Sequence, residues 1–364
     1  MTDARNKGSD LKVLLLAPNW LGDAVMFSAL IEFLHQHRQL RDGRRLLLDL
    51  AVRPAWAPLF EDDCRLNDLI LVQRGGRHSG LFGGWNLGQD FRKLNPDAVL
   101  LGPPSLRAGL GAWRSGAALR IGFSGDGRRP LLTHTLPTTT RGTFHHSAEL
   151  VQLGNLLLKT LGEQESKIQQ AEILPKVNGC DSIPAAVLDS ATPVWVLAPG
   201  ATYGSAKSWP LVRSMEFVKI AMEDHGKRVV LLGDAAASKF AEGLARGLDL
   251  HLEQNLSGGH GLVDLTGQTD LRQVVSILKS SQAFVGNDSG LMHLSASLGV
   301  PTVGVFGSSN PHWTSPKGER TAVVNAEGFE CRPCYRKSCN QKEFCLDAVS
   351  AQSVWEKLDH LLSQ

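Results

Sequence analysis

The stretch AFVGNDSGLMHLSASLGVP, from Ala283 to Pro301, is the most informative part of the sequence, because it has the pattern of a strand, a tight turn and a helix in succession. It opens with a short apolar run, turns sharply between Gly286 and Gly290, and then places leucines at helical spacing. Gly299 and the proline two positions later end the helix, as such a pair commonly does. Another apolar run, Thr302 to Phe306, follows. This order predicts half of a doubly wound α/β domain with a parallel sheet.

The turn within this stretch predicts a phosphate site. In doubly wound sheets, ligands bind beyond the carboxyl ends of the strands, where a helix N-terminus offers free N–H groups and partial positive charge. Gly290 lets a ligand approach the backbone closely, and Ser289 and His293 would face the same helix end. Two structural interpretations stay open. In the first, Asp288 or Ser289 caps the helix. In the second, His293 is a partly buried residue with its hydrogen bonds satisfied.

Size and composition predict a soluble globular protein of two ordinary domains. The chain has 364 residues, 42% of them apolar and 20% charged. A formal net charge of +2 is too small for bulk nucleic-acid binding, and no apolar run approaches a membrane span in length. The run from Val13 to Ala17 is too short for a signal-peptide core. We therefore expect a cytoplasmic protein with reduced cysteines and no nucleic-acid partner.

The N-terminal part of the chain repeats the strand–turn–helix pattern. Lys12 to Ala17 is a predicted strand, and a helix is expected from about Ala24 to His37. Asp23 lies between them, where it either caps the helix or acts as a general base at the end of the strand. The turn lacks the glycine fingerprint of nicotinamide and flavin sites. Further strands are predicted at Arg45–Val52, Asp68–Val72, Ala98–Leu101 and Leu119–Phe123.

Arginines gather between Pro103 and Arg129 with almost no acidic residues among them. The run includes Arg107, Arg114 and Arg120. A run of charges is commonly a solvated face of the protein. Alternatively, because guanidinium groups suit phosphate, this segment binds an anionic acceptor. The residues alone leave both interpretations open.

A polar segment, Glu163 to Ser190, indicates a linker, and a second α/β series begins after it at Val194–Ala198. The first turn of that series is rich in glycine and hydroxyl residues and carries Lys207 before a helix. Its spacing excludes a P-loop, but the lysine suits a diphosphate as a point charge; the alternative is an ordinary exposed lysine. Asp234, after the next strand, is a candidate for holding a ribose hydroxyl.

The tail of the chain carries four of the six cysteines, namely Cys331, Cys334, Cys339 and Cys345. Three interpretations stay open: a structural zinc site, reduced thiols that pack a loop, and disulfides. The spacing is not that of a standard zinc ribbon. A last amphipathic helix, Val349 to Leu362, is expected to pack back across the domains.

Four motifs, in order along nearly the whole chain, resemble those of the ADP-heptose:lipopolysaccharide heptosyltransferases. They are APNWLGDAVMFSAL at 17–30, PGATYGSAKSWP at 199–210, GNDSGLMHLSASLGVPTVGVFGSSNP at 286–311, and the cysteine tail at 331–346. The first and the last most resemble the heptosyltransferase II branch. The resemblance implies a glycosyltransferase-B architecture, in which two Rossmann-like α/β domains face a cleft. The implied parts are an acceptor domain at 1–175, a donor domain at 185–345 and the returning helix at 349–364.

The same resemblance implies an inverting transfer of heptose from ADP-L-glycero-D-manno-heptose to the anionic heptosyl-Kdo2-lipid A core, at the cytoplasmic face of the inner membrane. Asp23 would take the proton from the acceptor hydroxyl, and Lys207 would stabilise the leaving diphosphate. No metal cofactor is required, because the lysine and the helix dipole replace magnesium. The donor-binding residues would be Thr202, Gly204, Ser205, Asp234, Asp288, Ser289, Gly290 and His293. The acceptor-binding residues would be Arg107, Arg114 and Arg120.

Other functions remain as alternatives. The chain could be heptosyltransferase I or III, or another sugar-nucleotide enzyme of the same fold, such as an epimerase. A non-catalytic nucleotide-binding protein is a third class. Asp23 and Lys207 are both present, which favours an active transferase, since a decayed enzyme need not retain them.

Overall fold

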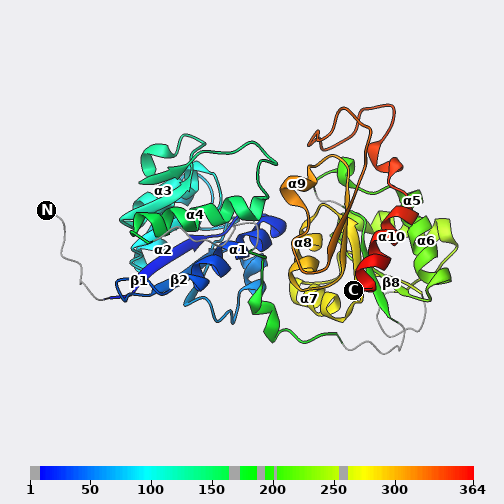
Figure 1. Cartoon of the computed structure of the whole chain (residues 1–364), viewed down its shortest axis with the longest axis horizontal. Coiled ribbons are helices and arrows are strands. Elements are labelled where there is room, and N and C mark those ends of the chain that lie inside the picture. The colour runs from blue at the N-terminus through cyan, green and yellow to red at the C-terminus, as the bar shows by residue number, and fades with distance from the viewer. Residues whose placement is uncertain (1–8, 164–172, 187–192, 201–202, 254–260) are drawn as a thin grey trace. The chain divides into compact units, whose positions relative to one another are not determined.

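The computed structural model describes residues 9–163, 173–186, 193–200, 203–253 and 261–364. The chain divides into two compact units (Figure 1). One is Met1–Thr140 with His146–Cys180, and the other is Arg141–His145 with Asp181–Gln364. Each unit contains a parallel β-sheet with helices on both faces, so the predicted fold class, two parallel-sheet α/β domains, is confirmed. That the domains face a cleft stays a prediction.

The first unit contains a six-stranded sheet in the order β3-β2-β1-β4-β5-β6, and all its strand pairs are parallel. The strands are β1 (Leu11–Leu16), β2 (Leu46–Val52), β3 (Asp68–Leu71), β4 (Ala98–Leu101), β5 (Leu119–Phe123) and β6 (His134–Leu136). The helices are α1 (Leu21–Gln36), α2 (Gly83–Lys93), α3 (Leu106–Ser115) and α4 (His146–Thr160). Short helical turns are η1 (Pro54–Leu59) and η2 (Arg129–Leu131), with η4 (Asn178–Ser182) where the two units divide.

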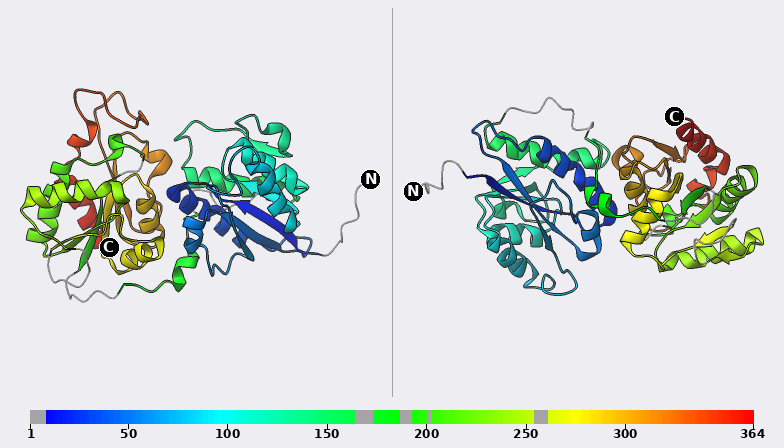
Figure 2. Two further views of the ribbon diagram at one scale, coloured as in Figure 1. Left: turned by 180° about the vertical axis from the view of Figure 1, so that it is seen from behind. Right: turned by 90° about the horizontal axis from the view of Figure 1, so that it is seen from below.

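Helices cover both faces of this first sheet. Leu14 and Leu16 of β1 share a buried cluster with Leu87 and Phe91 of α2. The right view of Figure 2 shows α1 and α4 on one side of the sheet and α2 and α3 on the other. Since strand residues alternate between the faces, β1 must be apolar at nearly every position, as its sequence LKVLLL is.

The second unit contains a seven-stranded parallel sheet in the order β13-β12-β11-β7-β8-β10-β9. The strands are β7 (Val194–Ala198), β8 (Arg228–Leu231), β9 (Leu252–Glu253), β10 (Leu262–Asp264), β11 (Ala283–Asn287), β12 (Thr302–Phe306) and β13 (Thr321–Asn325). The helices are α5 (Leu211–Lys219), α6 (Ser238–Leu248), α7 (Leu271–Ser280), α8 (Gly290–Ser297), α9 (Pro311–Thr314) and α10 (Ala351–Leu362). Short turns are η5 (Ser205–Lys207), η6 (Ile220–Asp224), η7 (Ala235–Ala237) and η8 (Cys345–Ala348).

The C-terminal helix α10 belongs to the core of the second unit. Its Val354 and Leu358 are fully buried in one cluster with Phe217 of α5 and Val305 of β12. The helix also packs along β13. Its apolar face is therefore used within this unit, and the prediction that it reaches across both domains stays untested.

The stretch from Ala283 to Pro301 forms the predicted strand and helix, but the turn is shorter than predicted, because Gly286 and Asn287 belong to the strand and Gly290 to the helix. All five residues of β11 are buried, and α8 follows after a two-residue turn. Gly299 ends the helix with φ +79°, a left-handed conformation that glycine adopts without strain. The strand β12 then pairs in parallel with β11. The turn at Asp288 therefore lies at the carboxyl edge of the sheet.

No helix within the described ranges is both long enough and apolar enough to cross a membrane.

Candidate functional site

An ion pair between Lys207 and Asp288 lies at the carboxyl edge of the second sheet. Lys207 ends the short turn η5 after β7, and Asp288 directly follows β11. Because β7 and β11 are hydrogen-bonded neighbours, their carboxyl ends bring the two turns together. The lysine Nζ lies 2.6 Å from the Asp288 Oδ2, with the side chains only 18% and 7% exposed. Two candidates 81 positions apart thus meet at one point, in front of α8.

The Asp288 carboxylate is held in its ionised form. Burial raises its pKa, but the nearby imidazole of His293 and the charge of Lys207 outweigh burial and hold the pKa well below its usual range. The Nε2 of His293 lies 3.7 Å from the Asp288 Oδ1. His293 is buried, as the structural interpretation expected, and its partner is the carboxylate itself.

The capping interpretation of this turn is confirmed for the position of Ser289 but not for its hydrogen bonding. Ser289 is the N-cap residue of α8, but its side chain makes no capping hydrogen bond. Its Oγ is buried and has no hydrogen-bond partner within the described part of the chain. A buried hydroxyl without a partner is costly unless a ligand satisfies it. The free N–H groups of α8, this hydroxyl and the Lys207 ammonium together form a site that suits a phosphate oxygen.

Asn287 fixes the loop that carries Lys207, and sequence reasoning missed it. Its side-chain oxygen accepts a hydrogen bond from the Trp209 N–H at 3.0 Å, and its amide nitrogen donates to the Pro199 carbonyl. The indole N–H of Trp209 donates to the Val349 carbonyl at 3.0 Å. The signal was present, since Asn287 is a polar residue at the end of an otherwise apolar strand.

The segment 331–345, which we call the cysteine strap, packs against the same loop. The Ala206 N–H donates to the Lys337 carbonyl at 3.0 Å, and the Tyr203 hydroxyl donates to the Tyr335 carbonyl at 2.9 Å. Gly204 has φ +154° and ψ 164°, a conformation confined mainly to glycine, and a Cβ there would collide with the Lys337 carbonyl. Gly204 is therefore required by packing, and its predicted contact with a donor stays a prediction.

The cysteines of the strap line one small cavity. Cys331, Cys334, Cys339 and Cys345 surround a volume of about 20 Å³. All six cysteines are free thiols, so the disulfide interpretation is wrong. Burial raises the pKa of the Cys345 thiol. No group of three or more His, Cys, Asp or Glu side chains within the described residues is arranged to hold a metal ion.

The remaining donor-site candidates have different outcomes. Asp234 caps η7, accepting a hydrogen bond from the Ala236 N–H at 3.1 Å, so its carboxylate has a structural use. Ser205 begins η5, two positions before Lys207. Thr202 lies outside the described residues. Their contacts with a ligand stay predictions.

In the first unit, Asp23 occupies the first turn of α1. The helix begins at Leu21, three positions earlier than predicted, and its N-cap residue is Trp20. Asp23 is therefore not the N-cap, and that interpretation is wrong. The side chain is partly exposed and follows β1, which lies between β2 and β4 in the sheet. This position, at the carboxyl edge near the sheet centre, is where doubly wound sheets place ligands.

The arginine-rich segment is partly structural. Arg120 donates to the carbonyls of Leu131 and Ala117, at 2.9 and 2.6 Å. Arg128 is fully buried, and burial lowers its pKa to about 10. Arg114 stacks on Trp85, its guanidinium carbon 4.3 Å from the ring centroid. Arg120 therefore supports the backbone around it. This weakens the interpretation that the whole segment is one binding surface for an anionic acceptor. Acceptor contacts by Arg107, Arg114 and Arg120 stay predictions.

Arg107 also belongs to a second cationic group, of which sequence reasoning found only this one member. Arg53 follows β2, Arg74 follows β3, and Arg107 is the second residue of α3 after β4. Burial lowers the pKa of Arg74, and the charges of Arg107 and Arg53 lower it further. We call these residues the arginine cluster. With Asp23 they follow the four neighbouring strands β3-β2-β1-β4, so they share one edge of the sheet.

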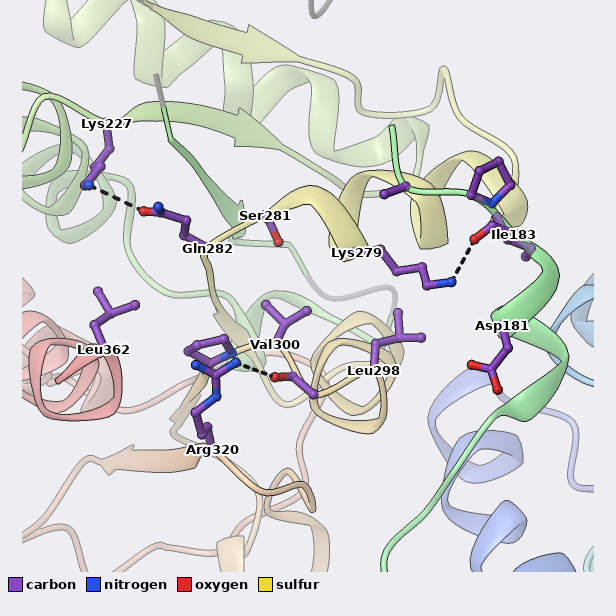
Figure 3. Close-up of a pocket in the computed structure, with 14 residues that line it drawn as sticks. Asp181, Ile183, Lys227, Lys279, Ser281, Gln282, Leu298, Val300, Arg320 and Leu362 are labelled. Atoms are coloured by element: carbon purple, nitrogen blue, oxygen red, sulfur yellow. Dashed lines mark hydrogen bonds between the residues drawn. The ribbon is translucent and has the colours of Figure 1, made fainter. Parts of the chain in front are cut away.

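A larger cavity of about 840 Å³ lies at the opposite, amino-terminal edge of the second sheet (Figure 3). Pro301 and Arg320 of its lining directly precede β12 and β13. The Lys279 Nζ donates to the Ile183 carbonyl at 2.7 Å, and Arg320 donates to the Gly299 carbonyl at 3.1 Å. Ligands of doubly wound sheets bind at the other edge, so we assign this cavity no ligand.

Known proteins similar to this chain belong to one enzyme family. Residues 85–344 match the model of "Glycosyltransferase family 9 (heptosyltransferase)". The chain is 27% identical to lipopolysaccharide heptosyltransferase 2 of Escherichia coli K12, over 97% of this chain and 99% of that protein. It is also 31% identical to lipopolysaccharide heptosyltransferase 1 of Pseudomonas aeruginosa, over 50% of this chain and 52% of that protein.

Among solved structures, the fold is similar to that of the E. coli ADP-heptose lipopolysaccharide heptosyltransferase II. The TM-score is 0.71 at 24% sequence identity, and the match covers 97% of this chain and 99% of that one. At this identity the likeness shows the fold, which is the two-domain architecture expected from the motifs.

Proposed function

This chain belongs to glycosyltransferase family 9, the heptosyltransferases, and we propose that it acts as a heptosyltransferase II. In that role it moves heptose from ADP-L-glycero-D-manno-heptose to the heptosyl-Kdo2-lipid A inner core of lipopolysaccharide, with inversion at the anomeric carbon. The observation that carries the proposal is the buried Lys207–Asp288 pair in front of α8. Similarity to heptosyltransferase 2 over nearly the whole chain supports the choice of reaction.

The second unit binds the donor in this proposal. The free N–H groups of α8 and the Lys207 ammonium contact the diphosphate and offset the charge that develops on ADP as it leaves. Asp288 orients the lysine, since their atoms lie 2.6 Å apart. This set of groups performs the charge neutralisation that magnesium performs elsewhere, so the reaction as proposed needs no metal cofactor. A structural zinc ion among the strap cysteines stays a separate prediction.

The first unit supplies the general base and the acceptor site in this proposal. Asp23 takes the proton from the acceptor hydroxyl as the oxygen attacks the anomeric carbon. The arginine cluster, at the same edge of the sheet, contacts the anionic groups of the inner core. An acceptor anchored by lipid A places the protein at the cytoplasmic face of the inner membrane as a peripheral enzyme.

The test of this function is ADP release from ADP-heptose with two acceptors, Kdo2-lipid A without heptose and with one heptose. Turnover that requires the mono-heptosylated acceptor supports heptosyltransferase II. Turnover with the heptose-free acceptor instead assigns the chain to heptosyltransferase I, which the local similarity to that enzyme makes the second candidate. Absence of release with both acceptors refutes heptose transfer to either core.

Charge reversal in the arginine cluster is expected to weaken the acceptor selectively. Arg74→Glu should raise the KM for the acceptor about 10-fold and leave the KM for ADP-heptose within about twofold, because one contact to an anionic group is lost. Initial rates with each substrate varied in turn measure this. The control is Arg92→Glu, an exposed arginine near the end of α2 that precedes β4 and so lies at the other sheet edge. An equal rise of both KM values would remove the cluster from the acceptor site.

A further inference from the structure

Tyr335, in the cysteine strap, is held in an unfavourable backbone conformation beside the donor site. Its φ is +51°, a left-handed value that costs a bulky residue free energy. Two hydrogen bonds maintain it: the Tyr335 N–H donates to the Ser308 carbonyl at 2.9 Å, and its carbonyl accepts from the Tyr203 hydroxyl at 2.9 Å. Strain of this kind persists where the surrounding structure fixes a side chain in place.

The ring of Tyr335 is fixed from two sides. It meets the Trp313 ring edge to face, with centroids 6.2 Å apart and an interplanar angle of 85°. The Arg141 guanidinium carbon lies 4.9 Å from the centroids of both rings. Packing and cation–π contact explain why an aromatic residue is present. They do not explain the hydroxyl, since a phenylalanine would make the same contacts.

The hydroxyl of Tyr335 is buried without a good partner. It has no hydrogen-bond partner within the described residues. Burial, chiefly, and the Asp288 charge raise the phenol pKa above its usual value, and they outweigh Arg141 and Asn310. The strap residue is tied to the donor site through Tyr203, whose hydroxyl bonds the Tyr335 carbonyl and whose ring centroid lies 5.3 Å from the Lys207 Nζ. At neutral pH the Tyr335 phenol is an O–H donor with its proton in place.

We propose that Tyr335 is a donor-binding residue whose phenol donates a hydrogen bond to an anionic oxygen of the nucleotide diphosphate held by Lys207 and α8. The inference rests on the proposed function, because it takes the donor to be a nucleoside-diphosphate sugar. The strap thereby acts as more than a support for the loop around Lys207. It contributes a ligand-contacting group from a part of the chain that lies beyond the last strand of the sheet.

The experiment measures ADP affinity and thermal stability in wild type, Tyr335→Phe and Tyr203→Phe. We expect Tyr335→Phe to weaken ADP binding about 10-fold in titration calorimetry, with an unchanged Tm, because the ring contacts remain. Tyr203→Phe should lower the Tm, since its hydroxyl bonds the strap backbone. Unchanged ADP affinity in Tyr335→Phe would overturn the inference and leave the proposed function intact. A wild type that does not bind ADP would overturn both.

A second measurement keeps the inference testable if Tyr335→Phe does not fold. The chain has only two tyrosines, so wild-type protein labelled with ¹³C at the tyrosine Cζ gives two signals. Tyr203→Phe identifies which signal belongs to Tyr335. Saturation with ADP should shift the Tyr335 signal strongly, as expected for a phenol that gains a phosphate partner. A Tyr335 signal that does not move at saturating ADP refutes the contact.

Discussion

The Asp23→Asn variant is expected to lose about 100- to 10,000-fold in kcat while it binds ADP as tightly as wild type. Asparagine has the shape of aspartate but cannot accept the proton of the attacking hydroxyl. Asp23 follows the central strand β1 and does not cap α1, so its replacement removes no helix-capping hydrogen bond. Stability should therefore change little, and the loss should be confined to chemistry.

Single-turnover kinetics with ADP-heptose and acceptor, together with calorimetric titration of ADP, measure the two quantities. Asp42→Asn is a suitable control, because Asp42 is an exposed carboxylate before β2, at the far edge of the same sheet. If Asp23→Asn kept more than about a tenth of wild-type kcat, Asp23 would not be the general base.

The fold could be predicted from sequence because buried parallel strands are continuous apolar runs. β4, β5 and β7 begin and end at the expected residues, whereas β11 continues through Gly286 and Asn287, which were expected in the turn. A capping box at Asp270 marks the start of α7. Strands such as β6 and β13 were not predicted. Each lies at an edge of its sheet, and its residues are only partly buried, so the apolar pattern is weaker.

Part of the candidate site could be predicted for a related reason. Lys207 and Asp288 stand in turns directly after strands, and parallel strands that are neighbours bring such turns to one edge. The contacts that hold those turns could not be predicted. Tyr335 reaches the site from an irregular segment, and no periodicity indicates where such a segment will pack. Arg120 looked like a surface cation because sequence shows its charge but not its carbonyl partners.

Lys207→Met is expected to lower kcat about 100- to 1,000-fold, because the ammonium stabilises the charge on the departing diphosphate more than that of the bound donor. ADP affinity should fall less, since the N–H groups of α8 remain. Lys219→Met, at an exposed position near the end of α5, is the matched control. A Lys207→Met variant that bound ADP more weakly but kept the wild-type kcat would show uniform binding instead of transition-state stabilisation.

The same variant should also be less stable at neutral pH, by about 1–3 kcal/mol, because it leaves a buried carboxylate with His293 as its remaining partner. The pKa of Asp288 in the folded protein is below its ordinary value of about 4 in the unfolded chain. The ion pair therefore stabilises the folded protein fully above about pH 4. This stabilisation is lost as the pH falls from about 4 through the lower pKa of the folded protein. Lys207→Met raises that folded pKa. The stability difference between wild type and variant should therefore be largest at neutral pH and should shrink as the pH falls below about 4. Urea unfolding of both proteins across this range measures it. A difference independent of pH would mean that Lys207 stabilises the loop by packing and not through its charge.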